Sequence, residues 1–156
     1  MSDESRLDAG KRVRRAVLGD AHVDRAEAAA TPFDAPFQRF ITETAWGTLW
    51  ADDTLDTRTR SLITIAILAS LGRHEELALH LRATSNTGAT PDEVRAALMH
   101  VAVYAGVPAA NSAFALAKTI VETQSSSQSR GQSRGQTPRA QPEGSDPLAP
   151  THGDSE

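Results

Sequence analysis

The chain has 156 residues, of which 39% are hydrophobic and 23% charged, and its formal net charge at pH 7 is −4. This composition fits one modest globular domain, and the absence of cysteine excludes disulfides, thiolate catalysis and cysteine-ligated metals. The acidic balance argues against a nucleic-acid partner. No apolar run approaches the roughly 18 residues of a membrane span, and no signal peptide is recognisable, so we expect no membrane association and a cytoplasmic location.

The first predicted elements are two helices near the N-terminus. Apolar residues recur loosely at helical spacing between residues 5 and 18, and Gly19 follows as an end signal. A second, short helix is expected over residues 23–30. His22 lies between two aspartates, and we interpret it as a surface histidine, because a metal site would need further ligands at fixed spacing.

An aromatic helix is expected next, starting after Asp34 as its N-cap and reaching about as far as Trp50. Trp46 and Trp50 are four residues apart and therefore share one helical face. Most of the few aromatic residues fall in this stretch, so the helix should wall either the main core or a ligand pocket. Packing in the core or at an interface is the default interpretation of the tryptophan pair.

The most apolar run is Ser61–Leu71, which follows an N-cap at Asp56 and stops at Gly72. A buried strand is one interpretation, but no second strand candidate could pair with it, so we predict a buried central helix. Arg58 and Arg60 fall in its first turn, where the helix dipole disfavours cations. Their placement indicates either carboxylate binding or salt bridges to the aspartates just upstream.

Residues 73–82 form the stretch around which the function is organised. Glu76 and His80 are four residues apart, so the carboxylate could accept a ring N–H and orient the imidazole. Leu77 and Leu81 form an adjoining apolar stripe that would anchor the segment to a core. The pair is a candidate acid/base unit, and the alternative is a surface helix with a solvated charged face.

Two further helices complete the expected fold. A capping box at residues 90–93, with proline at the first helical position, begins one that reaches Tyr104, and the next covers about 108–121. The total is about six helices and no strand, so we predict an all-α single domain over residues 1–123. The Ser-, Gln-, Gly- and Pro-rich residues 124–156 are expected to be disordered, because they cannot bury enough apolar surface to offset the entropy of ordering.

Five blocks of sequence carry a resemblance that extends, in order, over nearly all of residues 5–123. The blocks are Val13–Arg25, Ala45–Gly47, Thr59–Ala66, Glu75–Ala83 and Val103–Asn111. Together they resemble the 4-carboxymuconolactone decarboxylase family, which implies an alkylhydroperoxidase-like helical fold. Other members of that superfamily use a Cys-x-x-Cys pair, so a thiol peroxidase is excluded for this cysteine-free chain. His80 falls near the place of the second cysteine, where an imidazole suits proton transfer.

The resemblance implies decarboxylation of 4-carboxymuconolactone to 3-oxoadipate enol-lactone, in the protocatechuate branch of the β-ketoadipate pathway. Loss of CO2 leaves electrons that delocalise onto the lactone carbonyl, so we expect no cofactor and no metal, and no motif for either is present. His80 is then the expected proton donor and Glu76 the group that orients it. The expected substrate-binding side chains are the following: Arg58, Arg60, Arg82, Trp46, Tyr104 and Asn111.

Two alternatives stay open at this point. The family usually reads Ala-Leu-Asn-Asn-Gly where this chain has Ala-Thr-Ser-Asn-Thr-Gly at residues 83–88, and this departure allows a decarboxylase or isomerase of another small acidic lactone. A non-catalytic helical binding protein is the second alternative, although the presence of Glu76, His80 and Arg60 argues against it. The expected partners are a small dicarboxylate lactone and further copies of the chain, since the resemblance implies a homo-oligomer, often a hexamer built from dimers.

Overall fold

The computed structural model describes residues 4–133, with side chains described as far as Gln124. Within these residues the chain forms eight α-helices, one π-helix and no strand, which confirms the all-α prediction. The elements are α1 (Arg6–Leu18), α2 (Asp20–Ala29), α3 (Ala35–Ile41), η1 (Thr42–Trp50), α4 (Thr57–Ser70), α5 (His74–Arg82), α6 (Thr84–Thr87), α7 (Pro91–Tyr104) and α8 (Val107–Ser133).

The described residues hold more helices than the six or so that the sequence predicts, for two local reasons. The predicted aromatic helix is divided into α3 and the π-helix η1, in which backbone hydrogen bonds span five residues instead of four. Asp34 stands at the N-cap position of α3, but its carboxylate accepts hydrogen bonds from Thr31 instead. The second reason is the single-turn helix α6, in a stretch where the sequence analysis expects no helix; it ends at Gly88 in the left-handed conformation.

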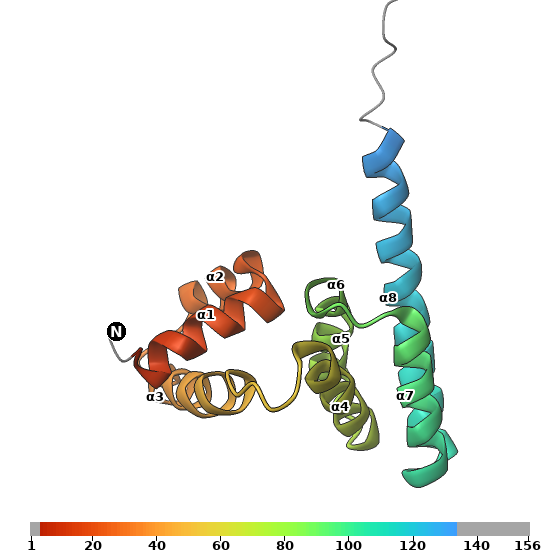
Figure 1. Cartoon of the computed structure of the whole chain (residues 1–156), viewed down its shortest axis with the longest axis horizontal. Helices are drawn as coiled ribbons and strands as arrows, with labels where there is room; N and C mark the ends of the chain where they lie inside the picture. The colour runs from red at the N-terminus through yellow and green to blue at the C-terminus, as the bar shows by residue number, and fades with distance from the viewer. Residues whose placement is uncertain (1–3, 134–156) are drawn as a thin grey trace, which may run out of the picture.

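The N-terminal arm, which we define as α1, α2, α3 and η1, lies to one side of the remaining helices (Figure 1). Within it, α1 packs along η1, and glycines allow the two backbones to touch. A Cβ atom on Gly10 would overlap the carbonyl oxygen of Thr42, and one on Gly47 would overlap that of Arg6. This backbone contact fixes the position of η1 and therefore of its tryptophans.

The main hydrophobic core lies among α4, α5, α7 and α8, with α4 and α5 in the middle of the molecule in Figure 1. Ile65, Leu77 and Leu98 are its most deeply buried large side chains. The predicted caps are present, since Asp56 accepts from the Thr59 backbone and a full capping box begins α7. The central helix is buried on one face only, because Ile67 on its other face is exposed.

A second, smaller hydrophobic cluster joins the N-terminal arm to the core. Its buried members are Val17 from α1, Trp46 from η1 and Ala83 from the end of α5. The Asn86 side chain strengthens the same junction, because its Nδ2 donates to the Val17 carbonyl oxygen at 2.9 Å. The arm and the core therefore meet at the C-terminal end of α5, which is the helix that carries His80.

Helix α8 continues to Ser133, ten residues beyond the predicted boundary of the folded domain. Serine and glutamine are weak rather than strong helix breakers, and a helix that has already formed extends at little cost. The rest of the predicted disordered tail, residues 134–156, lies outside the described residues. In the part of the chain that is described, no helix is long and apolar enough to cross a membrane.

Candidate active site

His80 lies in the last turn of α5 and packs against the two tryptophans of η1. Its ring centroid is 6.4 Å from that of Trp46 and 5.9 Å from that of Trp50, with interplanar angles of 9° and 22°. The two indole rings are themselves 5.2 Å apart. The structure thus brings together His80 and Trp46, both predicted site residues. Trp50, for which packing was the default interpretation, is also in contact with the imidazole.

The imidazole of His80 is buried without a hydrogen-bond partner. Only 9% of the residue is exposed, Nδ1 is fully buried, and neither ring nitrogen is hydrogen-bonded to any described residue. Burial lowers the pKa of His80 from 6.5 to about 4, and the nearby charge of His22 acts in the same direction. The ring is therefore neutral near pH 7. An unsatisfied buried polar atom in a native structure needs an explanation, and a ligand that bonds to it is one.

Glu76 does not form the predicted pair with His80. The Glu76 side chain is exposed in the first turn of α5, and no hydrogen bond joins it to His80 in the described structure. Helical spacing of four residues permits such a contact but does not enforce it. Here His80 faces the tryptophans of η1, whereas Glu76 faces solvent.

Arg60 and Arg58 are both engaged within the chain. The buried Arg60 donates from Nη2 to Asp52 Oδ1 at 2.7 Å and to the Asp52 carbonyl at 2.8 Å, and from Nε to the Leu55 carbonyl at 3.2 Å. The exposed Arg58 forms an ion pair with Glu93 at 3.3 Å. Arg60 therefore forms the salt bridge to an upstream aspartate that the sequence left open beside substrate binding. Arg58 instead pairs with Glu93 in α7.

Tyr104 is the last residue of α7, and Asn111 lies near the start of α8. The turn that joins these two helices is at the lower end of their hairpin in Figure 1. Tyr104 is 83% exposed, and its ring contacts that of His100 at 5.7 Å. Asn111 is also exposed. No hydrogen bond or ring contact joins either residue to His80 in the described part of the chain.

Arg82, in contrast, lines a cavity of about 410 Å³ between the arm and the end of α5. We call it the basic cavity, and its wall consists of Leu18, Gly19, Ala21, His22, Arg25, Leu79, Arg82, Ala83, Ser85 and Asn86. Sequence reasoning missed Arg25 and treated His22 as an ordinary surface residue. The available signal was that the two residues, three apart in a helix, share a face.

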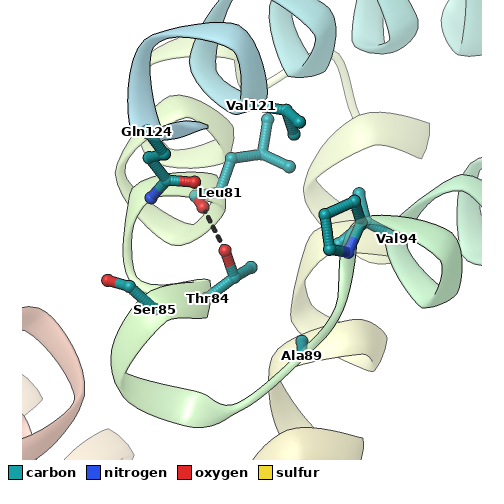
Figure 2. A pocket seen from close by; sticks show the side chains of 8 residues that line it. Leu81, Thr84, Ser85, Ala89, Val94, Val121 and Gln124 are labelled. Carbon is teal, nitrogen blue, oxygen red and sulfur yellow. Dashed lines mark hydrogen bonds between the residues drawn. The ribbon is translucent and has the colours of Figure 1, made fainter. Parts of the chain in front are cut away.

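A second cavity, of about 170 Å³, is lined from the same α5–α6 corner by Leu81, Thr84 and Ser85 and from the C-terminal helices by Val94, Val121 and Gln124 (Figure 2). Thr84 donates from Oγ1 to the Leu81 carbonyl at 2.8 Å, as the dashed line in Figure 2 marks. No charged side chain lines it. A dianion would find no counter-charge there, so we do not assign the site to this cavity.

The described residues contain no group of three or more His, Cys, Asp or Glu side chains that could hold a metal ion. The expectation that the protein works without a metal or cofactor stays a prediction.

Comparison with known proteins agrees with the resemblance found in the sequence. The model of the Carboxymuconolactone decarboxylase family matches residues 35–119, which include η1 and α5 but neither α1 nor α2. A 4-carboxymuconolactone decarboxylase from Acinetobacter baylyi is 45% identical over 120 residues, which are 77% of this chain and 90% of that protein.

Two further relatives have related names. A nitrosuccinic acid decarboxylase, npaB, from Metarhizium robertsii is 45% identical over 102 residues, covering 65% of this chain and 71% of that protein. A 4-carboxymuconolactone decarboxylase from Pseudomonas putida is 53% identical over 47 residues, covering 30% of this chain and 98% of that sequence. The chain belongs to the carboxymuconolactone decarboxylase family.

Proposed function

We propose that the protein is a carboxy-lyase that converts 4-carboxymuconolactone to 3-oxoadipate enol-lactone and CO2. The observation that carries the proposal is the unpartnered, buried imidazole of His80 on the tryptophans of η1. It occurs in a chain that is 45% identical to a 4-carboxymuconolactone decarboxylase over most of both lengths. The reaction belongs to the protocatechuate branch of aromatic catabolism.

The reaction needs a site in which one substrate carboxylate can leave as neutral CO2 and which supplies one proton. The bond between the ring carbon and its carboxylate breaks, CO2 leaves, and the electron pair passes through the ring double bond to the lactone carbonyl oxygen. A proton is then added to the ring carbon beside that carbonyl. The substrate supplies its own electron sink, so the chemistry requires no added cofactor.

His80 is our candidate for the group that delivers this proton. In the free protein burial keeps it neutral, with a pKa of about 4. Binding of a doubly negative substrate beside the ring favours the imidazolium form, because an opposite charge stabilises it. The protein would then take up a proton as the substrate binds, donate it to the ring carbon, and recover it from solvent.

Trp46 and Trp50 form an apolar wall beside the His80 ring. A carboxylate held against these rings is poorly solvated, whereas neutral CO2 is not penalised there, so this environment favours decarboxylation. Glu76 is exposed and has no contact with His80, and Arg60 is engaged by Asp52. We therefore rest the mechanism on His80 and the tryptophans and retain Glu76, Arg58, Arg60, Tyr104 and Asn111 as untested predictions.

Decarboxylation of nitrosuccinate is a second candidate, favoured by the 45% identity to the nitrosuccinic acid decarboxylase. The two candidate substrates share a chemical core. In both, the carboxylate that can leave sits on a carbon bearing an electron-withdrawing group, and that carbon also carries a CH2–COO⁻ arm. We call this shared part the succinate unit. The electron sink is a conjugated lactone in one substrate and a nitro group in the other.

We also propose that the protein is a homo-oligomer, with a hexamer as the state implied by the family resemblance. Several large apolar side chains in the arm are exposed in the single chain, with Phe33 at 95%, Phe37 at 59% and Phe40 at 61%. Exposed apolar surface of this kind is typical of an interface. Light scattering after size-exclusion chromatography tests the assembly. The cytoplasmic location stays a prediction from the sequence.

The test of the proposed function is CO2 release by the purified protein, with a chelator present, from three substrates assayed in parallel. The substrates are 4-carboxymuconolactone, nitrosuccinate and muconolactone, which lacks the leaving carboxylate. We expect release from 4-carboxymuconolactone that the chelator does not reduce. Faster release from nitrosuccinate would favour the second candidate. If protein with a normal helical spectrum releases CO2 from neither 4-carboxymuconolactone nor nitrosuccinate, the decarboxylase assignment is overturned and a binding protein is favoured.

A further inference from the structure

The basic cavity is built by parts of the chain that are distant in sequence. Residues 18–25, from the corner between α1 and α2, form one wall, and residues 79–86, from the end of α5 and from α6, form the other. The hydrogen bond from Asn86 to the Val17 carbonyl holds these walls together. The volume of about 410 Å³ falls within the range of small-molecule sites.

The charges of this wall have one sign. Arg25 and Arg82 are its two formal charges, and no Asp or Glu lines the cavity. Neither guanidinium forms an ion pair with a described residue, whereas Arg12, Arg15 and Arg58 all do. Two unpaired guanidiniums facing one cavity suit an anionic ligand, because the planar fork binds a carboxylate through two parallel hydrogen bonds.

The cavity is next to the proposed proton donor. Leu79 and Ala83 line it, and they flank His80 along α5. Ala83 also belongs to the cluster that contains Trp46. His22, on the opposite wall, is close enough for its charge to affect His80. A ligand that bridges the cavity and the tryptophan wall would therefore lie beside His80.

We propose that Arg25 and Arg82 together bind the carboxylate that the substrate retains, the one on the CH2–COO⁻ arm. The proposal rests on the proposed function and adds two things to it. It assigns a substrate-binding role to Arg25, which lies in α2, outside the region matched by the family model. It also says which carboxylate the arginines hold.

The choice of carboxylate follows from the chemistry. A guanidinium that gripped the departing carboxylate would stabilise its charge, which disappears in CO2, and would slow the reaction. Both arginines therefore belong on the retained carboxylate. The departing one is then left to the apolar wall formed by Trp46 and Trp50. Partly buried His22 can act as a third donor group, since a neutral imidazole still carries one N–H. Burial and the neighbouring Arg14 and Arg25 lower its pKa.

Two other cavities, of about 490 and 260 Å³, fit less well. One is lined by Asp52, Asp53 and Asp56, which would repel a dianion. The other contains Arg14 and Arg39, but their guanidiniums are bonded to Gln38 and Glu43, and none of its lining residues belongs to α5.

The test measures binding separately from turnover, with succinate as the probe. We expect isothermal titration calorimetry to show that Arg25→Gln and Arg82→Gln each weaken succinate binding by roughly 10–100-fold, the range for a hydrogen bond to a charged group. Arg82→Lys should bind with intermediate affinity, because it keeps the charge but loses the fork. The matched control is Arg73→Gln, which removes another exposed arginine without an ion pair, outside the cavity.

Steady-state kinetics with 4-carboxymuconolactone then separate the roles. Binding of the retained carboxylate stabilises the bound substrate and the transition state equally. Both Gln variants should therefore raise KM by about 10–100-fold, with kcat within about threefold of wild type. Lack of turnover by wild-type protein that still binds succinate through both arginines would overturn the proposed function but not this site. Unchanged succinate affinity in both Gln variants, an equal loss in Arg73→Gln, or no binding by the wild type would overturn the site itself.

Discussion

Arg60 and His80 are both buried polar side chains, 8% and 9% exposed, yet their surroundings differ completely. Arg60 finds a carboxylate and two backbone carbonyls within its own chain. His80 finds aromatic faces and no hydrogen-bond partner among the described residues. Since buried polar groups are normally satisfied, we propose from this difference that Arg60 serves the fold and that His80 is kept for a ligand.

The positions of the two side chains support this interpretation. Arg60 is bonded to the connection between η1 and α4, at Asp52 and Leu55, and so holds the end of the helix that carries the tryptophans. His80 lies at the junction of the arm and the core, next to the basic cavity. Arg60 would then influence the site by positioning Trp50, whereas His80 would contact the substrate.

The largest expected effect follows from removing the ring nitrogens of His80 while keeping an aromatic ring. His80→Phe should lower kcat for decarboxylation by about 10²–10⁴-fold, the usual contribution of a general acid. The fold should be retained or stabilised, because the buried Nδ1 without a partner costs roughly 1–3 kcal/mol. Initial rates and urea unfolding of the variant measure the two effects.

His100→Phe is the matched control, since His100 is exposed and contacts only the ring of Tyr104 among the aromatic residues described. We expect its decarboxylation rate to stay within about twofold of wild type. Full activity of a well-folded His80→Phe protein would assign the proton transfer to another group. It would also contradict the functional role given to His80 in its comparison with Arg60.

The next effect is the dependence of stability on pH. His80 has a pKa of about 4 in the folded protein, against 6.5 for an ordinary histidine, so the unfolded chain binds more protons between these values. The free energy of unfolding should therefore fall as pH falls from 6.5 toward 4, by roughly 3 kcal/mol from this residue. Urea unfolding at a series of pH values measures it.

The difference between wild type and His80→Phe isolates that contribution. His22 acts in the same direction, because burial lowers its pKa too, but it is present in both proteins. The carboxylates with lowered pKa, such as Asp52 and Asp56, also titrate in both. Parallel stability curves for the two proteins would mean that His80 has an ordinary pKa.

A smaller effect on stability, and little effect on chemistry, is expected at Arg60. Arg60→Met should lower the free energy of unfolding by about 1–3 kcal/mol, because a charge-assisted hydrogen bond is lost and two carbonyls lose their donor. Arg58→Met, the matched control at an exposed ion pair, should cost less than about 1 kcal/mol. Thermal unfolding measures both.

The same variant tests whether Arg60 also meets the substrate, as the sequence predicted. We expect kcat/KM of Arg60→Met, assayed well below its unfolding temperature, to fall by less than about tenfold. A loss of a hundredfold or more in kcat/KM by a fully folded variant would indicate that Arg60 contacts the substrate. Its bonds to Asp52 would then have to open when substrate binds.

Local patterns allowed much of the fold to be predicted. Asp56 and the capping box at Thr90 and Glu93 act over one helical turn, so their residues and spacing fix where α4 and α7 begin. The helical spacing of apolar residues and the lack of a second strand candidate were sufficient for an all-α assignment. The division of the aromatic helix into α3 and η1 was missed because η1 packs on α1 through Gly10 and Gly47, which is a tertiary contact.

The candidate site was predictable only in part, for a related reason. His80 and Trp46 stand out by residue type, and their contact was compatible with either packing or function. The solvent-facing direction of Glu76 depends on which face of α5 meets η1. Arg25 joins Arg82 at one cavity only because the chain folds back over more than fifty intervening residues. No local pattern encodes such a juxtaposition.

The most direct test of the account is an NMR titration of the His80 ring, with and without succinate, with His100 as the internal reference. We predict a pKa of about 4 in the free protein. Saturating succinate should raise it by at least about one unit, because the bound dianion stabilises the imidazolium. An ordinary histidine pKa in the free protein, or the same titration with and without succinate, would contradict the proposal that His80 takes up the proton for decarboxylation.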